Sequence, residues 1–274
     1  MKIPSNKAAC MSHLLMLVST SYRHWISGEM HYSKAAGFAK KMAELYPIDA
    51  TADARNWAKQ GGRYSAFLIM FPHDKDPTKI MYWLLSTGGG APKGYIDIHA
   101  REKLSDADIA ALGWRDQYEL VRIERKGKKP TWTWAMRRDY FARLDASAKQ
   151  AADAGRDALD TLFGMLCHMP MFSGVRGQVI KLNATAETTW NKQRKSSSYP
   201  EPLKPDGSTA DDPASYLPVM PKIKVWGDLT LDGLIAKMIE DEKRKNEAGA
   251  VEADAIVRAS KLELEANTSF LFIS

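Results

Sequence analysis

Apolar positions at the start of the chain form first a continuous run and then a helical repeat. Residues 14–18 are an unbroken apolar run, which predicts a buried strand. Further on, Phe38, Met42 and Leu45 recur at the spacing of one helix face, and Ser33 stands where a helix cap is expected. The chain is therefore predicted to open with a strand followed by a helix.

Two pairs of strand-like runs follow, and each pair is joined by a turn sequence. RYSAFLIMFP and KIMYWLLSTGGG flank HDKDPT, in which Asp and Pro are typical turn residues. YELVRIER and PTWTWAM alternate along their length and flank the turn RKGKKP. Each pair predicts a β-hairpin, so the expected sheet is antiparallel. A strand, a helix and hairpins in this order indicate an α+β fold with a ferredoxin-like core, the architecture of RRM-like RNA-recognition modules.

The second half of the chain changes from strand patterns to helix patterns. Residues 139–168 follow a helical spacing, as do the more acidic segments 229–245 and 251–265. Between them lies a stretch that is rich in Ser, Pro, Asp and Gly and nearly devoid of apolar residues. The expected organisation is an α+β domain at 1–195 with a helical insertion at about 138–168, a flexible loop at 196–215, and a C-terminal strand and helices at 216–274.

The composition is that of an ordinary globular chain with a basic surface. Of the 274 residues, 45% are hydrophobic and 26% are charged, which is enough apolar material for a sizeable core. The formal net charge is +6, and ten Lys or Arg against five Asp or Glu stand between Arg115 and Lys149. Basic residues gain most by displacing counterions from a phosphate backbone, so we expect a polyanionic partner.

Cysteine usage and hydropathy bear on the compartment. Cys10 and Cys167 are far apart and belong to no CxxC pair, so the sequence encodes neither a disulfide framework nor a zinc site. No apolar run reaches the roughly 18 residues of a membrane span, and the first residues lack the pattern of a signal peptide. We therefore expect a cytoplasmic protein with no membrane partner, and we predict no metal and no cofactor.

The second hairpin combines the densest positive charge with two tryptophans. Trp132 and Trp134 share one strand face, and cations next to aromatic planes suit single-stranded RNA, whose bases stack on indoles. Alternatively, both tryptophans belong to the core and the lysines only solvate the turn. On the RNA hypothesis, the binding cations of this region are Arg122, Arg125, Lys126, Lys128, Lys129, Arg137 and Arg138.

Two later segments add cations to the predicted RNA-binding set. MFSGVRGQVIKL places Arg176 between two glycines, which lets a ligand approach the backbone while Arg176 and Lys181 contact phosphate oxygens. The alternative is a connection between a helix and a strand with a solvated arginine. NKQRKSSS adds Lys192 and Arg194, although such a cluster is also typical of a solvated flank.

Several histidines and one glycine-rich stretch are assigned to no site. STGGGAPKG lacks the GK[ST] ending and the following helix of a phosphate-binding loop, so we expect an ordinary flexible turn. Five histidines stand alone in the sequence and are expected to be structural or exposed: His13, His31, His73, His99 and His168.

The segment SYRHWISGEM follows the predicted first strand and offers acid-base chemistry. RNA is cut without a metal when a 2′-hydroxyl attacks the adjacent phosphate, which requires proton transfer and cations. An imidazole with an ordinary pKa of about 6.5 suits His24 to move the proton, and the planar guanidinium of Arg23 suits a phosphate. Tyr22 and Trp25 would stack a base there. In the alternative, both aromatics anchor the helix to the sheet, and Arg23 pairs with Glu29.

Taken together, these segments resemble a family of CRISPR RNA-processing enzymes. SYRHWISGEM after a strand, the basic hairpin RIERKGKKPTWTW, a long helix and FSGVRGQV are similar to the crRNA-processing endoribonuclease of plasmid-borne type IV systems, within the RAMP superfamily. The resemblance covers residues 11–195. It implies cleavage of repeat RNA near a hairpin, retention of the stem-loop, and incorporation with backbone subunits into a guide-RNA complex of antiviral defence. It also assigns RNA handling to Arg23 by position.

Different functions remain open at this point. In the first, the chain is a metal-independent endoribonuclease that leaves a 5′-hydroxyl and a 2′,3′-cyclic phosphate, with Arg23 and His24 at the cut. In the second, it is a non-catalytic nucleic-acid-binding accessory protein of a plasmid or mobile element. Both require the basic hairpin, so the sequence does not separate them. A third possibility is an interaction protein whose helical C-terminus docks a partner.

Overall fold

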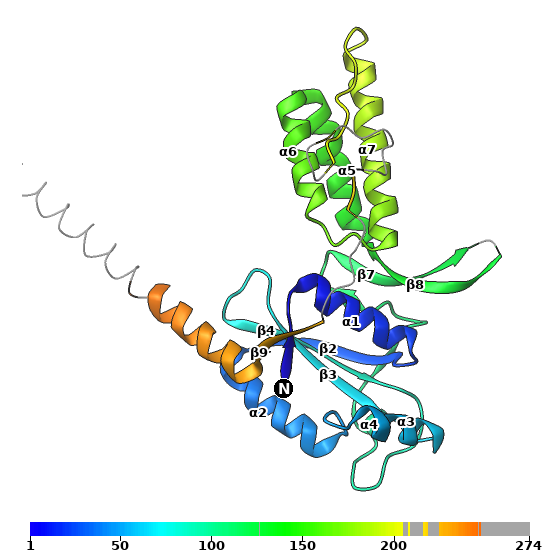
Figure 1. The fold of residues 1–274 in the computed structure, drawn as a ribbon, viewed down its shortest axis with the longest axis vertical. Helices are drawn as coiled ribbons and strands as arrows, with labels where there is room; N and C mark the ends of the chain where they lie inside the picture. The colour runs from blue at the N-terminus through cyan, green and yellow to red at the C-terminus, as the bar shows by residue number, and fades with distance from the viewer. Residues whose placement is uncertain (126, 205–207, 209–215, 219–224, 246, 248–274) are drawn as a thin grey trace, which may run out of the picture.

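The structure is a computed structural model of the chain. It describes residues 1–125, 127–204, 208, 216–218, 225–245 and 247. Figure 1 shows a sheet with its helices at one end of the molecule and a helical bundle at the other, with a long hairpin projecting sideways between them.

The central element is a four-stranded antiparallel sheet in the order β3-β4-β2-β5. Its strands are β2 (His24–His31), β3 (Ala66–Pro72), β4 (Lys79–Ser86) and the short β5 (Ser105–Asp106). The β3–β4 hairpin confirms the first predicted hairpin, and β4 then pairs with β2 along its whole length. The register places the first residue of β2 opposite the last residue of β4, and β5 pairs there as well.

Residues 14–18 are not a strand, so that prediction is wrong. They belong to helix α1 (Lys7–Ser19), which begins at Asn6, whose side chain accepts a hydrogen bond from the N–H of Ala9 at 2.8 Å. Seven of its side chains are buried: Ala9, Cys10, Met11, His13, Leu14, Leu17 and Val18. A helix that is buried on most sides has no wide polar face to interrupt its apolar run, and its sequence therefore resembles that of a buried strand.

Helices cover both faces of the sheet. On one face, α1 packs in a core with Ile69, Met81, Trp83 and Leu85. On the other face, α2 (Tyr32–Leu45) packs in a second core with Leu68, Met70, Ile80 and Leu84. The helix predicted around Phe38 and Met42 is thereby confirmed. Two short helices, α3 (Ala52–Gln60) and α4 (Ile98–Arg101), complete this part of the fold.

The fold is α+β with antiparallel sheets, as predicted, but the ferredoxin-like core is not confirmed. A ferredoxin-like chain follows the order β-α-β-β-α-β within one sheet. Here β1 (Lys2–Pro4) pairs with β9 (Trp226–Thr230) in a separate two-stranded sheet, and α1 and α2 lie on opposite faces of the central sheet. An RRM-like module binds bases on an open sheet face, whereas helices cover this sheet on both sides.

The segment after β9 returns to the main body. Residues 231–245 are helical, which confirms most of the predicted helix 229–245, and Figure 1 shows this orange helix next to α2. Its Leu231, Leu234 and Met238 join the second core. The helix predicted at 251–265 and half of the loop predicted at 196–215 lie outside the described residues.

The second predicted hairpin is also confirmed, and a bundle follows it. Strands β7 (Tyr118–Arg125) and β8 (Lys128–Met136) pair with the short β6 (Gly113–Trp114) in a three-stranded sheet. The bundle consists of α5 (Arg138–Ala154), α6 (Arg156–Cys167) and α7 (Ser173–Gln193). The helical pattern predicted at 139–168 is confirmed as two helices separated at Gly155, whose φ is +127°.

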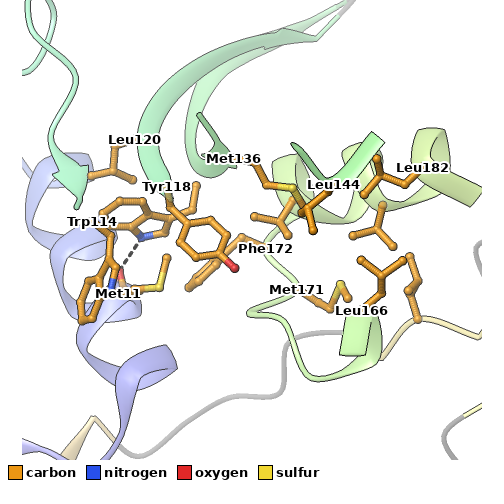
Figure 2. Packing of buried hydrophobic residues seen from close by; sticks show 14 of the residues in the cluster. Met11, Trp114, Tyr118, Leu120, Met136, Leu144, Leu166, Met171, Phe172 and Leu182 are labelled. Carbon is orange, nitrogen blue, oxygen red and sulfur yellow. Dashed lines mark hydrogen bonds between the residues drawn. The ribbon is translucent and has the colours of Figure 1, made fainter. Parts of the chain in front are cut away.

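A continuous apolar core joins the hairpin, α1 and the bundle. Figure 2 shows Met11 of α1 close to Trp114 and Tyr118, while Leu144, Leu166 and Leu182 lie together among the bundle helices. Trp134 is fully buried, and its indole N–H donates to the Met11 carbonyl at 2.8 Å. Trp132 is half-buried against the same core. The alternative that these tryptophans belong to the core is therefore correct, and the buried Trp134 cannot stack an RNA base.

Candidate functional site

Two imidazoles meet where β2 begins. The ring centroids of His24 and His99 are 4.9 Å apart, and the rings stand at 87° to each other. Both side chains are half-buried, so each has support from the protein and access to solvent. His24 is the first residue of β2, while His99 lies in α4, and we call these two residues the histidine pair.

A short helix and a carbonyl hold His99 in place. The Asp97 carboxylate accepts a hydrogen bond from the His99 backbone N–H at 2.9 Å, which caps α4. The His99 Nε2 atom lies 3.0 Å from the Thr87 carbonyl oxygen. Because a carbonyl only accepts, Nε2 must carry the proton, and in the neutral ring Nδ1 then has a free lone pair for accepting another proton.

Five exposed glycines form a surface next to the histidine pair. Gly61 and Gly62 end α3, and Gly88, Gly89 and Gly90 follow β4; together we call them the glycine platform. The two loops are joined by the Gly90 N–H, which donates to the Gly62 carbonyl at 3.0 Å. Gly89 has a φ of +123°, and a Cβ there would lie 2.7 Å from the Gly62 oxygen, so this position requires glycine.

The platform reaches the histidine pair at Gly88. A Cβ added to Gly88 would lie 3.8 Å from Nε2 of His24. The predicted flexible turn STGGGAPKG is indeed a turn, but hydrogen bonds to residues 62–64 fix its glycines. Bare backbone beside two imidazoles gives a ligand room for close approach.

Buried tyrosines support this end of the sheet. Tyr64 is fully buried, its hydroxyl donates to the Ile96 carbonyl at 2.6 Å, and burial raises its pKa to about 12. Its ring stands edge-on to His99, with centroids 6.0 Å apart. Tyr22 is only 3% exposed, and its hydroxyl shares a 2.9 Å hydrogen bond with Ser65. The prediction that Tyr22 stacks an RNA base is therefore wrong, because its ring lies inside the core.

Arg23 belongs to a different cluster from His24. Its guanidinium donates to Asp108 at 2.8 Å, and the guanidinium of Arg122 lies 3.7 Å from the same carboxylate. Successive residues of a strand point to opposite faces, and Trp25 packs in the core with α1. The structure therefore brings Arg23 and Arg122 together at Asp108, whereas the imidazole of His24 contacts that of His99.

Two alternatives for the same segment are tested by these contacts. Glu29 lies 3.3 Å from His73 and 3.9 Å from Lys79, so the predicted pair of Arg23 with Glu29 is replaced by the pair with Asp108. The indole of Trp25 donates to the Ala110 carbonyl at 3.2 Å and packs against the core, which matches its anchoring alternative.

The remaining hairpin cations differ in their surroundings. Lys129 and Arg138 are exposed, whereas Arg137 is half-buried with its Nε 3.8 Å from Glu119. Lys126 and the side chains of Arg125 and Lys128 lie outside the described residues.

Two arginines predicted to bind RNA are engaged by backbone carbonyls instead. Arg176 donates to the carbonyls of Leu217 and Pro218, at 2.6 and 3.1 Å, and so ties α7 to the chain that follows the bundle. Its segment is not a connection to a strand but the first half of α7. Gly174 lets α7 approach β8, because a Cβ there would lie 2.5 Å from the Trp134 oxygen, and the predicted ligand approach is not its role.

Arg194 closes the other end of α7. Its guanidinium donates to the carbonyls of Ala152 and Asp153 at the end of α5 and lies 4.3 Å from the ring centroid of Trp190. Arg194 is therefore a link between helices rather than a free cation. Lys181 and Lys192 are exposed on α7, so these two predicted cations are accessible.

The described ranges contain neither a metal-binding cluster nor a membrane-spanning helix. No group of three or more His, Cys, Asp or Glu in that part of the chain is arranged to hold a metal ion. None of its helices combines the length and apolarity that crossing a bilayer requires.

Comparisons with known proteins return no relative: no family model, no curated protein and no solved structure matches this chain.

Sequence reasoning named His24 but missed His99. The two residues are far apart in sequence, and the loops after β4 and before α4 bring them together. The one local signal was the run of three glycines directly after a predicted strand. Glycine at such a position often marks a place where a ligand or another chain segment comes close to the backbone.

Proposed function

We propose that the chain is an RNA-binding protein and a metal-independent endoribonuclease whose reacting groups are the histidine pair. The observation that carries this proposal is the 4.9 Å separation of two half-buried imidazoles next to exposed, side-chain-free backbone. Cleavage by an adjacent 2′-hydroxyl requires one group to take a proton and another to give one. Two imidazoles can fill both roles near neutral pH.

The contacts of the two imidazoles support His99 as the general base and His24 as the general acid. The His99 Nε2–H is held by the Thr87 carbonyl, so Nδ1 accepts the proton from the attacking 2′-hydroxyl. The new bond joins the 2′-oxygen to phosphorus, and the bond from phosphorus to the 5′-oxygen breaks. Protonated His24, with Nε2 beside Gly88, gives its proton to the leaving 5′-oxygen. The products are a 2′,3′-cyclic phosphate and a 5′-hydroxyl.

The proposed substrate is a structured repeat RNA of a CRISPR system, cut near its hairpin and held afterwards in a guide-RNA complex with backbone subunits. Support comes from the resemblance described above and from exposed cations away from the histidine pair. Lys129 on the projecting hairpin and Lys181 and Lys192 on α7 are accessible to phosphates. These cations fit a protein that grips a stem at a distance from the cut.

A second candidate is a non-catalytic nucleic-acid-binding accessory protein. Asp108 neutralises Arg23, the cation that the sequence assigned to the charged transition state, and it also pairs with Arg122. An arginine that is already paired contributes less to a developing phosphorane charge. This contact is the observation that favours binding without cleavage.

An RNA-cleavage assay in excess EDTA separates the two functions. Purified protein is incubated with repeat RNA under single-turnover conditions, and the termini of the products are identified. We expect cutting with a cyclic-phosphate end, and we expect His24→Ala and His99→Ala each to slow it by about 100-fold or more. A substrate with a 2′-deoxy sugar at the cut position should remain intact.

The matched control is His168→Ala, at the end of α6, which should cleave at the parental rate. Tight binding of repeat RNA that stays uncut by the parent protein would support the accessory function and rule out the nuclease hypothesis. Cleavage that survives both histidine substitutions would place the chemistry elsewhere.

A further inference from the structure

One tryptophan stands apart from the others in this protein. All eight tryptophans lie in the part of the chain that the structure describes, and seven of them are buried or half-buried. Trp57 on α3 is 73% exposed. A large aromatic side chain in water is an informative exception, since the burial of such a ring normally stabilises a fold.

The packing of α3 directs this indole outward. Arg55 and Lys59 are four residues apart on one face of α3, where the Arg55 guanidinium lies 3.7 Å from the ring centroid of Phe67 and the Lys59 ammonium 4.3 Å from that of Tyr22. The Arg55 side chain also donates to the Ile48 carbonyl at 2.7 Å. Trp57 lies between them in sequence and therefore on the opposite side of the helix.

The same helix leads directly into the glycine platform. The Gly61 N–H donates to the Trp57 carbonyl at 3.0 Å, and Gly62 then contacts the loop after β4 through the Gly90 N–H. At the other end of the platform, Gly88 is beside His24. Arg63, which follows Gly62 in sequence, is exposed. The exposed ring of Trp57, the glycine platform with Arg63 beside it, and the histidine pair are thus connected in series through α3 and the loop after β4.

We infer that Trp57 is a stacking platform for an unpaired base of RNA whose backbone crosses the glycine platform to the histidine pair. The inference rests on the proposed function and specifies its substrate as single-stranded at this point. A base inside a duplex has both faces covered by its neighbours, whereas an unpaired base has a free face for an indole. Glycines without side chains let the sugar-phosphate chain pass close to the protein backbone.

Binding to an uncleavable oligonucleotide tests this inference separately from catalysis. The probe is a fluorescein-labelled, 2′-O-methylated adenine strand of about 10 nucleotides, which has no nucleophilic 2′-hydroxyl. We expect Trp57→Ala to weaken its binding by about 5- to 100-fold, as measured by anisotropy, and Trp57→Phe to recover most of the affinity. Saturating unlabelled probe should quench the tryptophan emission of the parent protein but change that of Trp57→Phe little.

Two controls distinguish stacking from a general loss of structure or charge. Met165→Ala removes another exposed apolar side chain, on α6, and should bind as the parent does. A blunt RNA duplex should bind the parent and Trp57→Ala equally. Parental affinity of Trp57→Ala for the single strand, or an equal loss for the duplex, would overturn the inference.

The outcome is also separable from that of the proposed function. If binding depends on Trp57 but the protein does not cut RNA, the stacking role is supported and the nuclease hypothesis is ruled out. If cleavage depends on the histidine pair but Trp57→Ala leaves KM unchanged, the nuclease hypothesis is supported and the stacking role is ruled out.

Discussion

The bundle and the end of the central sheet use their polar groups in opposite ways. At the bundle, Arg176 and Arg194 turn inward and donate to backbone carbonyls, which joins helices to neighbouring chain. At the end of the sheet, His24 and His99 are half-buried beside exposed glycines and keep part of their rings accessible. In the bundle these two arginines are engaged in structure, whereas the histidine pair at the end of the sheet offers the more open chemistry.

The difference follows from the number of donors on each side chain. A guanidinium has five N–H donors and can satisfy two carbonyls at once, as Arg176 does at Leu217 and Pro218 and Arg194 at the end of α5. A neutral imidazole has one donor and one acceptor, so a single contact such as that of His99 with Thr87 leaves the other nitrogen available. The local count of basic residues is therefore a poor measure of the charge that remains available for a ligand.

The largest expected effect tests whether the bundle is fixed rigidly to the hairpin. Gly174→Ala should lower the free energy of unfolding by about 3 kcal/mol, because its Cβ would meet the Trp134 carbonyl oxygen, which is part of the β8 backbone and cannot rotate away. Urea unfolding monitored by circular dichroism measures the change. The control is Gly177→Ala in the same helix, where a Cβ meets nothing within 4 Å and better helix propensity should stabilise by about 0.5–1 kcal/mol. Equal stability of the two variants would mean that the bundle is not held this closely.

The next effect lies on the sheet side and depends on pH. His13 is buried between Phe67 and Trp226, and burial together with the Arg55 guanidinium lowers its pKa from 6.5 to about 4. Between pH 6.5 and pH 4 the unfolded chain binds a proton at this residue and the folded chain does not. The stability that the neutral His13 contributes is therefore present above pH 6.5 and lost as the pH falls toward 4, by up to about 3 kcal/mol.

The variant His13→Phe isolates this contribution from that of the carboxylates. Urea unfolding at several values between pH 7 and pH 4 should show a shallower loss of stability for His13→Phe than for the parent. Parallel pH profiles would show that the pKa of His13 is the same in the folded and the unfolded chain, which would contradict the prediction.

The smallest effect compares an engaged cation with an exposed one at the end of α7. Arg194→Ala should lower the free energy of unfolding by about 2 kcal/mol, because it removes charge-assisted hydrogen bonds to two carbonyls. It should leave the salt dependence of RNA binding unchanged. Lys192→Ala should change stability by less than about 0.5 kcal/mol and lower the salt slope by about 0.7–0.9, the value for one lost phosphate contact. The reverse pattern would contradict the assignment of engaged and exposed cations.

Local patterns were enough to predict the hairpins and the amphipathic helix α2. In β7 and β8, alternation and a turn that contains Gly127, with a φ of +71°, are both encoded within a few residues. Helix α7 was not predicted, because Phe172 stands at its N-cap and gives no side-chain cap hydrogen bond, so the sequence carries no start signal there. Helix α1 was missed because its apolar side chains are spread around the helix, and burial by the sheet and the hairpin decides its structure.

The same misassignment limited the site. With a strand predicted at 14–18, Arg23 and His24 followed it directly and were predicted to act together at the cut. In the structure Arg23 precedes β2 and pairs with Asp108, whereas His24 is the first residue of the strand and contacts His99. The contact with His99 depends on the pairing of β2 with β4 and on the loop to α4, which no local pattern encodes. The nuclease and binding hypotheses remain predictions, to be decided by the assays above.

The pairing of β1 with β9 constrains how this protein is made. Lys2 lies opposite Thr230, so β1 meets its partner only after more than 200 further residues have been synthesised. Until then the backbone groups of β1 that face β9 have only water or transient contacts. Co-translational folding can complete the central sheet and the bundle first, and closure of the two-stranded sheet is left as a late step of biogenesis.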